Sequence, residues 1–240
     1  MLRLFTYYLV LTIITVIGGT GAAIVGLFNP YSSIIHGFIM RTWSKIIVRV
    51  TDTTVTINGL DHIKPEQSYL VVCNHQSNMD IPVLVANLPL LVTFIAKKEL
   101  FKIPFFGWGL KGAGMIKVDR SNTKQAIESL KNAEKNIINN KLSVIAFPEG
   151  TRSKDGEIHP FKKGPFILAM NTGIPILPVS LKGTFNILPR NRLILKKGNV
   201  RLQVHEPIDV RSYSFEDRFK LIKRVHTIIS ESFYGSAQTV

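Results

Sequence analysis

The first forty residues form a long apolar stretch, with no charged side chain from Leu4 to Met40. Residues 4–28 are long enough to cross the hydrocarbon core of a bilayer, which takes roughly 20 apolar residues in a helix. A turn at residues 29–33 precedes a second helical pattern, which carries Trp43 and becomes basic towards Arg49, as suits a lipid headgroup boundary. The pattern predicts a hydrophobic two-helix motif that anchors the chain to a membrane.

A cleaved signal peptide is the alternative interpretation of this segment, because small residues at positions 18–23 follow the first apolar run. Two features disfavour cleavage: Arg3 is the only basic residue before the run, and apolar residues resume at Ile24. Small residues at these positions suit close helix packing instead. We therefore expect residues 1–50 to be an N-terminal helical membrane anchor.

Beyond residue 50 the pattern changes to short apolar or β-branched runs that alternate with helical periodicity. The runs predict seven strands, at residues 54–58, 69–73, 92–96, 115–118, 143–147, 176–181 and 200–205. A helix is predicted over residues 123–138, and another closes the chain after Ser214 as its N-cap. This alternation predicts an α/β fold, with a largely parallel or mixed sheet flanked by helices. Since there is no internal repeat or linker, residues 51–240 are expected to form one domain.

The charge of the chain narrows the choice of partners. Its 30 basic and 16 acidic residues give a formal net charge of +14, which indicates an anionic membrane surface, nucleic acid or phosphorylated substrate. One basic cluster could follow a nucleic-acid backbone: Arg190, Arg192, Lys196, Lys197 and Arg201. No nucleic-acid-binding motif accompanies this cluster, and the N-terminus is apolar. We therefore expect no nucleic-acid partner and assign the cluster to anionic lipid headgroups.

A histidine and an aspartate follow the predicted strand at residues 69–73. His75 and Asp80 are five positions apart, so they can meet only if His75 lies in a loop and Asp80 begins a helix, which Pro82 favours. Asp80 could then hold one imidazole nitrogen while the other accepts a proton. The alternative is an ordinary aspartate helix cap beside a histidine bonded to the backbone.

Cys73 is the only cysteine of the chain, which excludes an internal disulfide and a zinc site built from several thiolates. A Cys73–His75 nucleophile is also disfavoured. Alternate residues of a strand share a face but lie roughly 7 Å apart, beyond the reach of a hydrogen bond.

Three further polar segments follow predicted strands: Lys97-Lys98, Asp119-Arg120 and residues 149–152 (EGTR). Each by itself could be a surface ion pair or an ordinary turn. In a largely parallel sheet, however, the strand ends meet at one edge, so these segments and His75 can converge. A base beside cationic phosphate ligands predicts activation of a hydroxyl group on a phosphorylated small molecule. The chain has no GxxxxGK[ST] loop and no GxGxxG that opens a predicted helix, which disfavours nucleoside triphosphate and dinucleotide sites.

Four segments together resemble the motifs of the PlsC-type glycerolipid acyltransferases, in the same order along the chain. Residues 74–80 (NHQSNMD) resemble the NHxxxxD motif of that family. The other three are residues 114–120 (GMIKVDR), 147–153 (FPEGTRS) and 174–179 (IPILPV). The resemblance covers about residues 70–210 and extends to the apolar N-terminus. Lys117 departs from the pattern, because its position in the second motif is usually apolar.

The resemblance implies a 1-acyl-sn-glycerol-3-phosphate O-acyltransferase. Such an enzyme moves a fatty acyl group from acyl-CoA or acyl carrier protein to the sn-2 hydroxyl of lysophosphatidic acid and gives phosphatidic acid. It implies that His75 is the general base and that Asp80 orients and stabilises this histidine. It also implies a set of substrate-binding residues, helped by residues 162–164: Lys97, Arg120, Glu149, Gly150, Thr151 and Arg152. No metal and no redox cofactor is implied.

The same resemblance implies a membrane-associated enzyme whose site faces the cytoplasm, at the inner membrane if the chain is bacterial. An acyltransferase for a different lysophospholipid or a lyso-aminolipid is an alternative. So is a non-catalytic lipid-binding protein of the same fold, which the intact pair of His75 and Asp80 disfavours.

Overall fold

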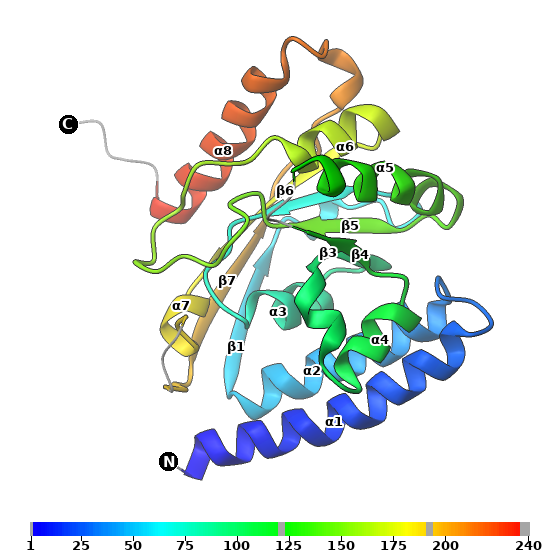
Figure 1. The fold of residues 1–240 in the computed structure, drawn as a ribbon. Coiled ribbons are helices and arrows are strands. Elements are labelled where there is room, and N and C mark those ends of the chain that lie inside the picture. Colours follow the sequence, from blue (N-terminus) through cyan, green and yellow to red (C-terminus); the bar gives the residue numbers. More distant parts are fainter. Residues whose placement is uncertain (1, 120–122, 191–193, 236–240) are drawn as a thin grey trace.

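A seven-stranded mixed sheet forms the centre of the computed structural model, which describes residues 2–119, 123–190 and 194–235 (Figure 1). The strand order is β1-β7-β6-β2-β5-β3-β4, and all neighbours run parallel except β6 and β7. The strands are β1 (Thr53–Asn58), β2 (Leu70–Cys73), β3 (Val92–Lys97), β4 (Ile116–Val118), β5 (Ser143–Ala146), β6 (Ile176–Lys182) and β7 (Gly198–Val204). The predicted α/β fold with a mixed sheet is therefore confirmed.

Helices cover both faces of this sheet (Figure 1). They are α1 (Leu2–Gly26), α2 (Met40–Val50), α3 (Asp80–Asn87), α4 (Phe106–Gly112), α5 (Thr123–Asn139), α6 (Gly164–Thr172), α7 (Thr184–Ile187) and α8 (Arg218–Tyr234). Val71 and Cys73 of β2 belong to the core under α2 and α3, whereas Leu70 and Val72 belong to the core under α6 and α8. Because β2 is buried on both faces, its sequence is a continuous apolar run.

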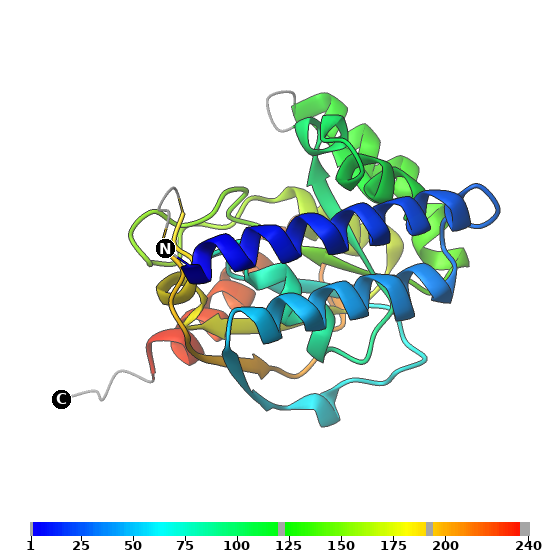
Figure 2. The same cartoon turned by 90° about the horizontal axis from the view of Figure 1, so that it is seen from below.

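The two N-terminal helices form the predicted hydrophobic pair. A π-helical turn, Ile34–Ile39, leads into α2, so that α1 and α2 lie side by side (Figure 2). By length and composition, α1 is the one helix of the described residues that could cross a membrane. Its small residues pack against α4: a Cβ atom on Gly19 would lie 2.3 Å from the carbonyl oxygen of Phe105. The expectation of close helix packing at residues 18–23 is confirmed, and the partner residue Phe105 is 86 positions further along the chain.

The closing helix begins later than predicted. Ser214 was expected to cap it directly, but α8 starts at Arg218. The reason is a turn that precedes the helix, in which the Ser214 hydroxyl donates to Asp217 Oδ2 over 2.7 Å and the Asp217 N–H donates back to Ser214 Oγ over 3.3 Å. Ser214 and Asp217 therefore provide each other's hydrogen-bond partners in the turn that precedes the regular helix.

Candidate active site

His75 and Asp80 lie in contact at the carboxyl end of β2. Nδ1 of His75 is 2.7 Å from Oδ2 of Asp80, whose side chain is fully buried, while the His75 side chain is 12% exposed. The same oxygen accepts the backbone N–H groups of Gln76 (2.7 Å) and Ser77 (2.9 Å). These bonds curl the loop around the carboxylate before α3 begins at Asp80. The five-residue spacing therefore works because no helix has yet started at His75.

The alternatives considered for this pair do not fit the geometry. Asp80 accepts from residues that precede it, not from the first turn of α3, so it is not an ordinary helix cap. Cys73 is fully buried in the core, and its burial raises the pKa of the thiol well above the ordinary value. A buried thiol of raised pKa is a poor nucleophile.

The ring of His75 is held from one side by Phe147, at the end of the neighbouring strand β5. The two ring centroids are 4.0 Å apart and the planes are inclined by 18°. With Asp80 on Nδ1 and Phe147 on its face, the imidazole has one fixed orientation. Nε2 has no hydrogen-bond partner among the described residues and is available to accept a proton.

Two further residues of the first motif hold the loop in place. Asn74 exchanges two hydrogen bonds with the backbone of Leu181 in β6, over 2.8 and 2.9 Å. Ser77 donates to the carbonyl oxygen of Leu188 over 2.6 Å. Sequence reasoning did not assign these roles or that of Phe147. The signal in the sequence that could have indicated these roles is the run of polar residues directly after an apolar strand.

Glu149 lies behind the histidine and is 4% exposed. One carboxylate oxygen accepts the backbone N–H of His75 over 2.6 Å, and the other accepts the backbone N–H of His159 over 3.0 Å. Burial raises the pKa of this carboxyl to about 7, although both hydrogen bonds act in the opposite direction. Its position supports holding the backbone of His75, which differs from the expected role of lining the acceptor site.

The loop after Glu149, residues 150–152, carries a glycine, a threonine and an arginine. Gly150 has φ of +75°, a left-handed conformation, and a Cβ atom there would lie 2.8 Å from Nζ of Lys162. Thr151 is exposed, and Arg152 is half-buried. Burial, followed by the charge of Arg190, lowers the pKa of Arg152, while Asp80 acts in the opposite direction. The backbone N–H of the next residue, Ser153, donates to the carbonyl oxygen of His75 over 2.8 Å, so this loop lies beside the His75–Asp80 pair.

Of the remaining predicted cations, Lys97 lies further along the sheet edge. Lys97 ends β3, which is two strands from β2 and hence roughly 10 Å away. Its side chain is 52% exposed and lies 3.6 Å from Glu99, whereas the adjacent Lys98 pairs with Asp119 over 2.5 Å. Arg120 lies outside the described residues. The structure thus brings His75, Asp80, Glu149 and Arg152 together and leaves Lys97 at a distance.

The unusual Lys117 does not disturb this edge. It stands between the buried residues Ile116 and Val118 of β4 and points outward, with Nζ 5.9 Å from the ring centroid of Phe101. The strand alternation therefore accommodates a lysine where the family pattern is apolar. Within the described ranges, no three His, Cys, Asp or Glu side chains gather as metal ligands would.

Comparisons with known proteins show what this chain is similar to. The family model described as Acyltransferase matches residues 54–182. A chloroplastic 1-acyl-sn-glycerol-3-phosphate acyltransferase of Brassica napus is 38% identical, over 79% of this chain and 55% of its own length. An enzyme of the same name from Saccharomyces cerevisiae is 31% identical, over 87% of this chain and 71% of its own length. The chain therefore spans about half the length of the plant relative.

One solved structure is similar over nearly the whole chain. It is the 1-acyl-sn-glycerophosphate (LPA) acyltransferase PlsC from Thermotoga maritima, with a TM-score of 0.81 and 30% sequence identity. The similarity covers 96% of this chain and 93% of the other. It includes the N-terminal helices as well as the sheet.

Proposed function

The chain belongs to the acyltransferase family, and we propose that it transfers a fatty acyl group from an acyl thioester to the sn-2 hydroxyl of lysophosphatidic acid. The product is phosphatidic acid, and the donor is acyl-CoA or acyl carrier protein. One observation carries the reaction type: Asp80 holds Nδ1 of His75 at 2.7 Å, which leaves Nε2 to act as a base. The names of the relatives support the acceptor.

The proposed reaction is a direct transfer without an acyl-enzyme. Nε2 of His75 removes the proton of the acceptor hydroxyl as its oxygen attacks the thioester carbonyl carbon. The tetrahedral intermediate collapses, the carbon–sulfur bond breaks, and the thiolate takes the proton back from the imidazolium. Asp80 stabilises the positive imidazolium between these two steps, because its carboxylate is buried and already in contact with Nδ1.

The phosphate of the acceptor requires cations near the base. The backbone N–H of Ser153 donates to the carbonyl oxygen of His75 over 2.8 Å, which brings the adjacent Arg152 to the base, so we assign the phosphate to Arg152 first. Gly150 and Thr151 then line the acceptor site beside it. Lys97, the last residue of β3, and Arg120 are proposed to add positive charge to the phosphate site.

A panel of acceptors tests this function. We expect purified protein in detergent to convert lysophosphatidic acid and an acyl thioester into phosphatidic acid, measured by mass spectrometry. Acyl-CoA and acyl carrier protein donors should be compared in parallel, because the proposal leaves both open. If the enzyme preferred lysophosphatidylethanolamine or a lyso-aminolipid, that lipid would be the acceptor in place of lysophosphatidic acid. No transfer to any lysolipid would support a non-catalytic lipid-binding protein.

We also propose that residues 1–50 attach the acyltransferase domain, residues 51–240, to a membrane. Large apolar side chains of α1 and the following turn are exposed, including Phe5 (66%), Ile17 (68%) and Phe28 (87%). Yet α1 is fastened at both ends: Arg3 donates to the carbonyl oxygen of Thr51 over 2.6 Å, and Gly26 packs on the backbone of α4. A helix that lies on its own domain over its whole length favours insertion in the plane of one leaflet.

Labelling of single cysteines tests this attachment. In a Cys73→Ala background, cysteines placed at Leu2 and at Phe28 should react with the same impermeant reagent from the same side of sealed vesicles. Reaction of the two ends from opposite sides would show that α1 spans the bilayer. We expect the side of the membrane on which the acyltransferase domain lies to be the cytoplasmic side.

A further inference from the structure

Arg190 reaches the active-site loop from a distant part of the chain. It follows α7, and its neighbour Pro189 pairs with Ser77 of the first motif through an isolated β-bridge. Nη1 of Arg190 donates to Oγ1 of Thr151 and to the carbonyl oxygen of Arg152, both over 2.9 Å. Sequence reasoning placed Arg190 in a surface cluster for lipid headgroups. The structure places it in contact with the loop that carries Arg152.

The two arginines form a pair of like charges. Arg190 donates to the main chain of Arg152, and burial, followed by the charge of Arg190, lowers the pKa of the Arg152 guanidinium. In the part of the chain that the structure describes, neither group has a carboxylate within salt-bridge distance. Other basic side chains do, including Lys98 with Asp119 and Arg211 with Asp209.

The anchoring of Arg190 leaves donors for a ligand. Only Nη1 is bonded to the loop, so Nη2 and Nε remain, and the guanidinium of Arg152 has no hydrogen-bond partner among the described residues. Two planar guanidinium groups with free donors suit a phosphate, which can accept from both at once. An anion between them would also remove their mutual repulsion.

We propose that Arg190 and Arg152 together bind the terminal phosphate of the acceptor, and that Arg190 makes the site prefer a phosphate monoester over a phosphodiester. The substrate in this inference rests on the proposed function. A monoester carries close to two negative charges at pH 7, because its second pKa is near 6, whereas a diester carries one. Two guanidinium groups therefore match the monoester, and a single one suffices for the diester.

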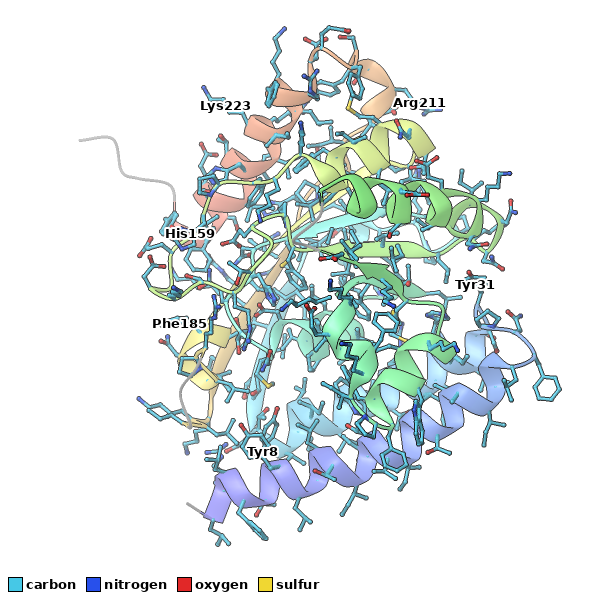
Figure 3. All side chains as sticks on the ribbon, in the orientation of Figure 1. Tyr8, Tyr31, His159, Phe185, Arg211 and Lys223 are labelled. Atoms are coloured by element: carbon cyan, nitrogen blue, oxygen red, sulfur yellow. The ribbon has the colours of Figure 1, made fainter. Side chains whose placement is uncertain are left out.

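The test compares Arg190→Gln with Lys223→Ala. Glutamine keeps a donor for Thr151 and removes the charge, whereas Lys223 is an exposed lysine on α8, which is drawn at the opposite end of the molecule from α1 (Figure 3). We expect Arg190→Gln to raise KM for lysophosphatidic acid by about 10- to 100-fold, the range for a lost charge-assisted hydrogen bond. KM for the acyl donor and kcat with neutral monoacylglycerol should change less than about twofold.

A role in loop geometry alone would give a different result. It would lower kcat equally for lysophosphatidic acid, lysophosphatidylglycerol and monoacylglycerol, with no change in the preference for the monoester. That outcome would overturn the inference. The double variant with Arg152→Ala adds a second criterion: its effect should be smaller than the product of the single effects, because both groups bind one anion.

Binding without turnover separates this inference from the proposed function. Glycerol 3-phosphate should raise the thermal midpoint of the wild type and of Lys223→Ala, and this rise should disappear in Arg190→Gln and Arg152→Ala. If the wild type failed to acylate lysophosphatidic acid but kept this thermal response, the proposed function would be wrong, and the proposal that Arg190 and Arg152 bind a phosphate would still be supported. A missing response in the wild type, or an unchanged one in Arg190→Gln, would overturn the pair.

Discussion

Replacing His75 with alanine is expected to lower kcat for lysophosphatidic acid by about 1,000-fold or more. Nε2 is the only nitrogen of this ring without a bond to Asp80, and it alone is placed to take the proton of the attacking hydroxyl. General base catalysis typically contributes 10²- to 10⁴-fold, and no other described imidazole contacts Asp80. Steady-state assays with saturating donor and acceptor give the measurement.

The chain contains a matched control for this variant. His159 also contacts an aspartate, with Nε2 3.2 Å from Oδ1 of Asp155, but that pair is about half-exposed and stands on the loop surface. His159→Ala keeps the backbone N–H that Glu149 binds and should retain kcat within about twofold. Equal turnover in His75→Ala and wild type, with the fold intact by circular dichroism, would rule out the proposed mechanism.

Asp80→Asn is expected to lower kcat by at least about 100-fold while KM for the acceptor changes little. Asparagine can keep an oxygen facing His75, Gln76 and Ser77, so the loop geometry survives. The negative charge that stabilises the imidazolium is lost, and this charge matters only as the proton moves. The kcat and KM values, measured separately, distinguish this effect from a loss of substrate binding.

The same variant also has an expected cost in stability. Oδ1 of Asp80 is buried without a hydrogen-bond partner among the described residues, so the amide nitrogen of asparagine would occupy an unsatisfied position. An unpaired buried donor costs about 1–3 kcal/mol, which a denaturant titration can detect. Asp155→Asn in the exposed pair serves as the control. If Asp80→Asn kept wild-type kcat, the aspartate would have only a structural role.

The sequence determined the strands and the long helices of this protein because the information for them is local. Each strand of the sheet is a short apolar or β-branched run, and the first N-terminal helix follows from a charge-free stretch. The pairing of His75 with Asp80 could also be formulated from the sequence. Both residues belong to one loop, so their meeting depends on a few neighbouring backbone N–H groups.

Only the tertiary structure decided which distant segments complete the site. Phe147 stacks on His75 because β5 lies next to β2, and Asn74 is fixed because β6 lies on the other side. The family resemblance implied that Glu149 lines the acceptor site, and only the fold shows that its carboxylate also accepts two backbone N–H groups. These contacts depend on strand order, which apolar periodicity does not encode.

Arg190 is the clearest case of a contact that the sequence pattern did not predict. In the sequence it belongs to a basic cluster 38 positions after Arg152, and charge alone assigned that cluster to lipid headgroups. In the fold, the bridge between Pro189 and Ser77 brings it onto the active-site loop. The amino-acid pattern therefore determined the strands and the long apolar N-terminal helix, and it predicted the contact of His75 with Asp80. The folded sheet decided which charges surround that pair, because bringing residues far apart in the chain together requires the packed core between them.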